Sequence, residues 1–165
     1  MKKCQVGKSK IHGNGVILSK DIKAGETIFL FLGEEITITT NEWFRLPNAL
    51  QVGYVKWIVP RPNSVGNYLN HSCTPTAGVR GKNRIVAINN MRQGDEVTID
   101  YALSESHPLW HMRCKCKSRN CRRIVKPYQD LPMQKIKQYI DYTSQYLLDM
   151  KIHLSWKEYF EVRKR

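Results

Sequence analysis

The middle of the chain contains the polar loop Gly66-Asn67-Tyr68-Leu69-Asn70-His71-Ser72-Cys73-Thr74-Pro75. Taken alone, this loop suggests a hydrolase in which His71 is the base and a neighbouring hydroxyl or Cys73 is the nucleophile. That interpretation is weak, because a nucleophile next in sequence to its base rarely gains the required geometry and no carboxylate follows to orient the histidine. For a single histidine in a loop, a hydrogen-bonded structural role is the simpler alternative.

A second polar stretch contains three cysteines and reads Cys114-Lys115-Cys116-Lys117-Ser118-Arg119-Asn120-Cys121. Cysteines separated by one residue are poorly placed for a mutual disulfide, whereas thiolates at this spacing can share a metal ion. A closed tetrahedral zinc site needs a fourth ligand. We expect it to be Cys73 rather than Cys4, because Cys4 lies near an end of the chain that we expect to be mobile. Three reduced, unliganded thiols are the alternative, and an iron–sulfur cluster is disfavoured by the spacing.

Short apolar runs separated by turns predict a mostly β architecture. Candidate strands cover residues 16–18, 27–32, 35–40, 84–88 and 96–101, with a further strand pair within residues 51–59. Turn signals such as Gly13-Asn14-Gly15 separate them, and they do not alternate with long helical patterns as strands do in βαβ proteins.

The pattern changes after Pro127. Apolar residues recur at helical spacing from Ile136 to Met150, so we predict one amphipathic helix over residues 132–150. Ser155-Trp156-Lys157-Glu158 has the form of a capping box and predicts a second, shorter helix.

Basic residues outnumber acidic ones by 27 to 14, and the net charge is +13. Such an excess favours polyanions or acidic surfaces as partners. Residues 113–126 include no acidic residue and seven basic ones, namely Arg113, Lys115, Lys117, Arg119, Arg122, Arg123 and Lys126. Two interpretations of this run stay open, a solvated surface and a contact with nucleic acid.

The sequence contains neither a membrane span nor a secretory signal that we can identify. No apolar run approaches the roughly 18 residues of a span, and the basic start of the chain lacks the apolar stretch of a signal peptide. We therefore expect an intracellular protein of the cytoplasm, nucleus or nucleoid, with export by a non-classical route left open.

Further motifs surround the polar loop in a fixed order. Before it come Gly13-Asn14-Gly15 and Phe31-Leu32-Gly33-Glu34, and after it come Gly94-Asp95-Glu96-Val97-Thr98-Ile99-Asp100-Tyr101 and the cysteine cluster. The ordered combination resembles the SET-domain family of protein-lysine methyltransferases over about residues 6–125, and the cysteine cluster resembles that family's post-SET segment. The resemblance implies a SET domain at residues 1–112, a post-SET zinc segment at 113–126 and a C-terminal helical extension at 127–165.

The resemblance implies a SET fold of small β-sheets, in which a carboxyl-terminal pseudoknot brings Asn70 and His71 beside Tyr101. It also implies S-adenosylmethionine as the methyl donor, held by Gly13, Asn14, Gly15, Asn70 and His71. The implied structural zinc ion is held by Cys73, Cys114, Cys116 and Cys121.

Tyr101 is the implied catalytic residue. Methyl transfer to an amine is an in-line displacement that depends on alignment, and a lysine whose pKa is near 10.4 must first lose its proton. A tyrosine hydroxyl can orient the lone pair of that amine.

The implied function is a protein-lysine N-methyltransferase, a chromatin regulator acting on a histone, a histone-like protein or another basic protein. The alternative is a non-catalytic zinc module that has kept the SET scaffold and binds nucleic acid, but such a module has no physical need of Tyr101, Asn70 and His71. Three positions depart from the usual pattern of the family. Asn14 stands where an aromatic residue is frequent, Phe31 where an active-site tyrosine is common, and Thr76 where asparagine is usual.

Overall fold

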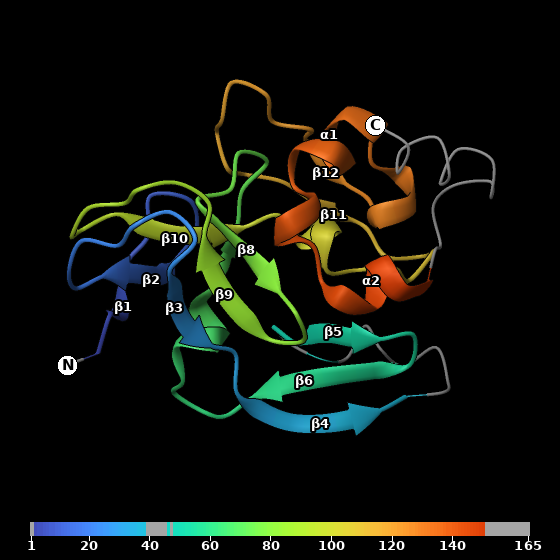
Figure 1. Cartoon of the computed structure of the whole chain (residues 1–165), viewed down its shortest axis with the longest axis horizontal. Helices are drawn as coiled ribbons and strands as arrows, with labels where there is room; N and C mark the ends of the chain where they lie inside the picture. Colours follow the sequence, from blue (N-terminus) through green and yellow to red (C-terminus); the bar gives the residue numbers. More distant parts are fainter. Residues whose placement is uncertain (1, 39–45, 47, 151–165) are drawn as a thin grey trace.

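The computed structural model describes residues 2–38, 46 and 48–150, and these residues form a mostly β fold (Figure 1). One sheet has the strand order β1-β2-β10-β7, with the strands β1 (Cys4–Lys8), β2 (Asn14–Leu18), β10 (Glu96–Ile99) and β7 (Asn70–His71). A second consists of β3 (Thr27–Leu30), β9 (Arg84–Ala87) and β8 (Ala77–Arg80). A third consists of β4 (Gly33–Thr37), β6 (Lys56–Pro60) and β5 (Leu50–Gly53). The predicted β class is therefore confirmed.

The first sheet joins three distant parts of the sequence. β10 pairs with β2 in antiparallel fashion and with β7 in parallel fashion. In the parallel ladder Thr98 lies opposite Asn70 and Ile99 lies opposite His71. The end of β10 therefore delivers the residues that follow it, Asp100 and Tyr101, to the Asn70-His71 pair.

Two hydrophobic cores fill the fold. The first lies between the sheets and includes Val16, Ile85 and Val97, each with an exposed fraction of 0%. The second comprises Cys73, Ala102, Leu103, Val125, Tyr128, Leu131, Ile136, Tyr139 and Leu147. Tyr101 packs against the first core and its neighbour Ala102 belongs to the second, so the end of β10 lies where the two cores meet.

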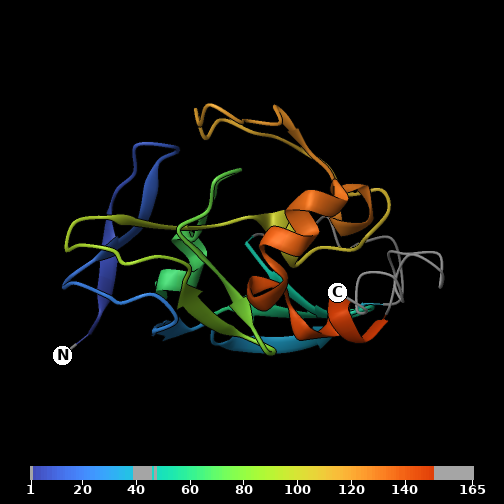
Figure 2. The same ribbon diagram turned by 45° about the horizontal axis from the view of Figure 1, so that its top comes forward.

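Residues 113–126, which we call the cysteine segment, are closed at their base by a two-stranded ladder of β11 (Met112–Arg113) and β12 (Ile124–Val125). In Figure 2 this segment extends from the helical end of the molecule over its middle, toward the β1–β2 hairpin. It thereby approaches the strands that carry Asn70 and His71.

Residues 127–150, which we call the C-terminal segment, correct the prediction of one helix over 132–150. They form two 3-10 turns (Tyr128–Asp130 and Ile140–Tyr142) and two short helices, α1 (Met133–Gln138) and α2 (Gln145–Met150). The helix breaks because the backbone N–H groups of Ser144 and Gln145 donate to the carbonyls of Leu103 and Gly81 instead of continuing the helix. Tertiary contacts thus override the helical periodicity. The second predicted helix, at Ser155-Trp156-Lys157-Glu158, lies outside the described residues.

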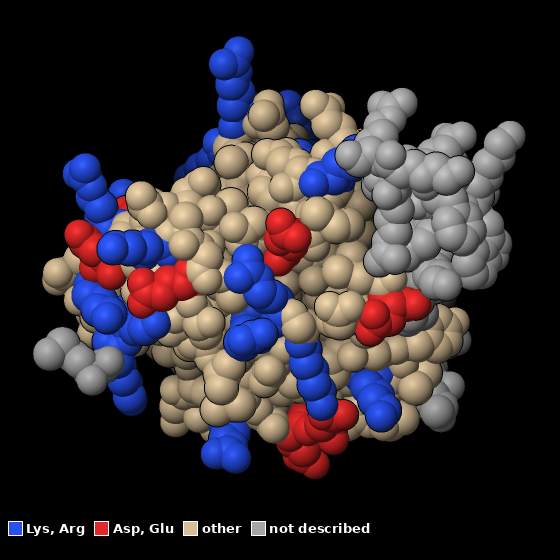
Figure 3. Space-filling model, viewed as in Figure 1, with Lys and Arg blue, Asp and Glu red and all other residues tan. Residues whose placement is uncertain are grey.

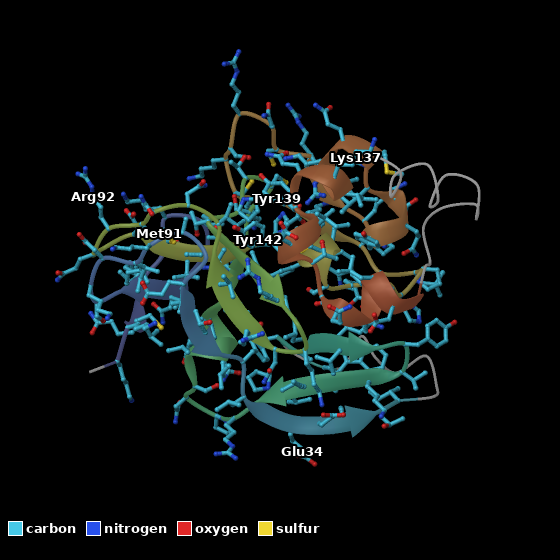
Figure 4. All side chains as sticks on the ribbon, viewed as in Figure 1. Glu34, Met91, Arg92, Lys137, Tyr139 and Tyr142 are labelled. Atoms are coloured by element: carbon cyan, nitrogen blue, oxygen red, sulfur yellow. The ribbon has the colours of Figure 1, made fainter. Side chains whose placement is uncertain are left out.

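The C-terminal segment packs closely on the second sheet. Tyr139 and Tyr142 lie near β8, while Lys137 lies on the outer side of α1 (Figure 4). A Cβ placed on Gly78 of β8 would lie 2.6 Å from the Tyr142 carbonyl oxygen. Glycine is therefore required where this segment crosses the sheet.

Cys4 also corrects an expectation. It is buried in β1, with an exposed fraction of 5%, and pairs with Leu18 of β2, so Cys4 lies in the edge strand of a sheet and not in a mobile tail.

Within the described residues, no helix is long and apolar enough to cross a membrane.

Candidate functional site

His71 and Tyr101 lie side by side at the end of the parallel ladder. Their ring centroids are 5.2 Å apart, and the backbone N–H of Tyr101 donates to His71 Nδ1 at 3.2 Å. The Tyr101 hydroxyl donates to the carbonyl of Leu69 at 2.6 Å. The predicted juxtaposition of the two residues is confirmed.

The hydrogen bond from the Tyr101 backbone to His71 defines the tautomer of the imidazole. Because His71 Nδ1 accepts the Tyr101 N–H, a neutral ring carries its proton on Nε2, which lies 3.4 Å from Cys73 Sγ. Burial, together with the positive charge of Arg122, lowers the pKa of His71 to about 3. His71 is therefore neutral at physiological pH and suited to orient other groups rather than to exchange protons.

Asp100 organises the turn that carries Tyr101. It is the N-cap of the 3-10 turn Tyr101–Leu103, where Asp100 Oδ1 accepts the N–H of Ala102 at 3.1 Å. The same oxygen lies 3.6 Å from His71 Nδ1. One buried carboxylate thus contacts both the turn and the histidine loop.

Asn70 ties its loop to the β1–β2 turn. Its amide group donates to the Asn14 carbonyl at 3.0 Å and to Glu96 Oε1 at 2.9 Å. Gly13 has a positive φ of 54°, and a Cβ built on it would meet nothing within 4 Å, so its backbone is open to an approaching group.

Two cavities flank Tyr101. The first, which we call the donor cavity, has a volume of about 310 Å³ and is lined by Ile11, His12, Asn48, Asn70, His71, Tyr101, Met112, Arg113 and Lys115. Of the residues predicted to hold a cofactor, Asn70 and His71 line it, whereas Gly13, Asn14 and Gly15 do not; the Asn14 carbonyl accepts a hydrogen bond from the Asn70 amide. Ile11 and His12, just before the Gly-x-Gly motif, lie in the lining instead.

The second, which we call the amine cavity, has a volume of about 360 Å³ and includes Phe31, Trp57, Leu69, Ile99 and Tyr101 in its lining. Tyr101 therefore borders both cavities. Phe31 presents a ring without a hydroxyl, as its sequence position predicted. Asn48 and Met112 also border both.

Four sulfur atoms converge beneath the cysteine segment. The Sγ atoms of Cys73, Cys114, Cys116 and Cys121 all lie within 4.8 Å of one another, and Cys73 Sγ is 3.7 Å from Cys114 Sγ. Four thiolates around zinc at about 2.3 Å would lie roughly 3.8 Å apart. The geometry is compatible with a closed tetrahedral site, and Cys4 is not part of the cluster.

Two charged residues near Tyr101 escaped the sequence interpretation. Arg122, which the sequence groups with a solvated basic run, donates to Asp100 Oδ1 at 2.5 Å and is half-buried. Glu105 is the one acidic residue that the described chain contributes to the amine cavity. Burial raises the pKa of Glu105 to about 7, although hydrogen bonds from the backbone of His107 and Ser106 lower it. The only local signals were their positions, one residue after Cys121 and four after Tyr101.

Basic side chains are spread over the face shown in Figure 3, with acidic side chains between them. The cysteine segment differs, because its basic residues alternate with inward-facing cysteines. Lys115, Lys117 and Arg119 are exposed, while Cys114 and Cys116 are half-buried.

Comparison with known proteins identifies the class that this fold and site define. The SET domain family model matches residues 13–102, more than half of the chain, and the chain therefore belongs to the SET-domain family. The predicted family is confirmed.

Relatives of the chain carry the names of histone-lysine methyltransferases. Over 73% of this chain, it is 31% identical to histone-lysine N-methyltransferase trithorax of Drosophila virilis and 27% identical to histone-lysine N-methyltransferase 2B of Homo sapiens. It is 28% identical over the same share to the H3 lysine-4 specific histone-lysine N-methyltransferase of Cryptococcus neoformans. The chain spans only 4%, 5% and 10% of the length of these three proteins.

Proposed function

We propose that this chain is an S-adenosylmethionine-dependent protein-lysine N-methyltransferase. The observation that carries the proposal is the position of Tyr101, which borders the donor cavity on one side and the amine cavity on the other. An in-line displacement requires that donor and acceptor approach the same point from opposite sides. The family membership supports the reaction class.

The donor cavity fits the charge distribution of the proposed methyl donor. When bound, S-adenosylmethionine supplies a methyl group on a positively charged sulfonium. His71 is neutral, so it places no opposing positive charge beside that group. Arg113 and Lys115 line the same cavity and can pair with the donor's carboxylate.

The amine cavity fits an uncharged lysine side chain. Phe31, Leu69 and Ile99 give it apolar walls, and desolvation by such walls lowers the pKa of an ammonium group. Burial raises the pKa of Tyr101, so its phenol stays protonated. The Tyr101 oxygen and the Leu69 carbonyl, 2.6 Å apart, offer two acceptors that direct the N–H bonds of the amine and leave its lone pair free.

Methyl transfer tests this proposal. Labelled S-adenosylmethionine is incubated with the protein and a mixture of basic proteins, including core histones. Tyr101→Phe is expected to lower kcat by about 10²-fold or more, with cofactor affinity changed only severalfold. Tyr54→Phe, on a tyrosine that is 66% exposed, is the matched control. Absence of transfer from wild type to every protein, or equal rates for wild type and Tyr101→Phe, contradicts the proposal.

The substrate that we propose is a lysine of a histone or another basic protein, within chromatin or a comparable intracellular DNA complex. The relatives' names support this class, and Glu105 gives the amine cavity a carboxylate that can attract a cationic side chain. The intact Asn70, His71 and Tyr101 arrangement argues against a scaffold that has lost catalysis.

We further propose that the cysteine segment contacts nucleic acid carried with that substrate. Exposed lysine and arginine side chains project from a backbone that the four cysteines hold in place. Arg122 does not belong to this contact surface, because it pairs with Asp100. The double change Lys117→Glu with Arg119→Glu is expected to weaken binding to duplex DNA and to reduce the slope of log K against log salt by roughly 1 to 2. Lys56→Glu, which changes an exposed residue at the start of β6, is the control. Equal slopes for all three proteins contradict this contact.

A further inference from the structure

A buried ion pair joins the cysteine segment to the turn that carries Tyr101. Arg122 Nη2 donates to Asp100 Oδ1 at 2.5 Å, and the Asp100 side chain is only 1% exposed. The other terminal atoms of the pair, Asp100 Oδ2 and Arg122 Nη1, are buried without a hydrogen-bond partner in the described part of the chain. Among the lysine and arginine side chains of the described residues, Arg122 is the one that forms an ion pair with this carboxylate.

Arg122 also contacts the sulfur cluster. Its backbone N–H and its side-chain Nε–H both donate to Cys73 Sγ at 3.4 Å. Cys121 immediately precedes it in the sequence, so gathering the four sulfur atoms also places the guanidinium. A metal-bound thiolate accepts such hydrogen bonds well because it carries negative charge.

Asp100 connects Arg122 to the turn that carries Tyr101. It caps the turn through the Ala102 N–H and lies beside His71 Nδ1, which in turn accepts the Tyr101 N–H. We propose that Arg122 is a positioning residue for methyl transfer: its ion pair with Asp100 holds the Tyr101 turn against the histidine loop once the cysteine cluster is assembled. This inference rests on the proposed function for its catalytic consequence but not for the ion pair itself.

A double-mutant cycle tests the ion pair, since removing one partner of a buried pair leaves an uncompensated charge whereas replacing both does not. Arg122→Met is expected to lower kcat roughly tenfold or more, and Asp100→Asn with Arg122→Met to return it to within about threefold of wild type. The KM for the methyl acceptor is expected to change less than kcat, because alignment and not substrate binding is lost. Melting temperatures are expected to show the same recovery.

Matched variants separate positioning from a general loss of structure. Arg92→Met alters an exposed arginine that lies outside both the pair and the cysteine segment, and it is expected to behave as wild type. Arg122→Met is expected to keep one zinc per chain because all four cysteines remain. If Arg122→Met fails to fold, folding of the double variant supports the proposal, and failure of the double variant to fold overturns it.

The contradicting results are distinct. Equal kcat for Arg122→Met and Arg92→Met overturns the proposal. So does a double variant whose loss in kcat equals the sum of the losses of Asp100→Asn and Arg122→Met. Recovery in melting temperature without recovery in kcat overturns the positioning role and leaves only a structural one. If wild type transfers no methyl group, the proposed function fails, and the proposed effect of Arg122 on kcat fails with it. The melting temperatures still decide whether Arg122 acts through Asp100.

Discussion

The two hydrophobic cores of this protein are held together in different ways. The first is formed by residues between Cys4 and Ile99, whose strands pair through backbone hydrogen bonds in three sheets. The second contains Cys73 and residues after Tyr101, and its backbone runs mainly in short turns and helices. Tyr101 packs on the first and Ala102 on the second. The site thus lies between a core fixed by strand pairing and a core that depends on thiols, one ion pair and side-chain packing.

The two regions contribute different parts of the site. Strand pairing places Asn70 and His71 in register with the end of β10. The second region supplies Met112, Arg113 and Lys115 to the donor cavity and Glu105 to the amine cavity. Damage to the second core should therefore remove function while leaving much of the first core folded.

Removal of Cys73, the expected zinc ligand that follows the Asn70-His71 pair in the polar loop, is expected to have the largest effect. Cys73→Ala leaves three thiols and removes the acceptor for Arg122, so the zinc content is expected to fall from one per chain to near zero. Because structural zinc contributes on the order of 10 kcal/mol in small domains, activity is expected to be lost while the far-ultraviolet signal of the β sheets largely persists. Metal analysis and circular dichroism measure the two effects.

Cys4→Ala is the control for that experiment. Cys4 is equally buried but lies in β1, away from the cluster, so this variant should retain its zinc. A full zinc complement in Cys73→Ala would show that Cys73 is not a ligand.

A smaller effect is expected where the C-terminal segment crosses β8. Gly78→Ala places a methyl group against the Tyr142 backbone, and overpacking of this kind costs about 1–3 kcal/mol in the free energy of unfolding. Zinc content should not change, because the cluster is untouched. Gly53→Ala is the control, since its Cβ would lie 3.2 Å from the nearest atom, Lys56 Cβ, and would contact no backbone atom within 3.2 Å. Equal urea midpoints for the two variants would refute the packing described for Tyr142.

The last effect is of similar size but is confined to part of the pH range, and it concerns the pH dependence of stability at Glu105. Burial raises its pKa to about 7 from an ordinary value of 4.5. The unfolded chain therefore loses this proton at lower pH than the folded chain, so the contribution to stability is complete below about pH 4.5 and is lost as pH rises to about 7. Glu105→Gln removes this dependence, and relative to wild type it should gain about 1–3 kcal/mol across that window.

Urea denaturation at a series of pH values measures that gain. Glu34→Gln is the control, because Glu34 is exposed on β4 and projects away from the body of the molecule in Figure 4. A difference between Glu105→Gln and wild type that stays constant with pH would contradict the buried environment assigned to Glu105.

Much of the site could be predicted because its residues are local in sequence. The Asn70-His71 pair, Tyr101 after an apolar strand and the three close cysteines each form a short motif, and ligand counting added Cys73. The order of these motifs along the chain indicated the SET-domain family. The β class followed from short apolar runs, although the strands β1, β7, β8, β11 and β12 were not predicted.

What could not be predicted depends on long-range contacts. The helix expected over 132–150 breaks because Leu103 and Gly81 accept hydrogen bonds from its backbone. Arg122 belongs to a basic run that is typical of a solvated surface. Only its contact with Asp100, 22 positions away in the sequence, gives it another role. Glu105 likewise acquires its character from burial, which the sequence does not record.

Calorimetric titration with S-adenosylhomocysteine, the demethylated donor, tests most directly that the cavity beside His71 and Tyr101 receives the methyl donor. The account predicts one binding site per chain, affinity lowered at least about tenfold in Asn70→Ala because the β1–β2 turn loses its anchor, and near-normal affinity in Tyr101→Phe. Absence of binding to the zinc-loaded protein, or binding that Asn70→Ala leaves unchanged, would contradict it.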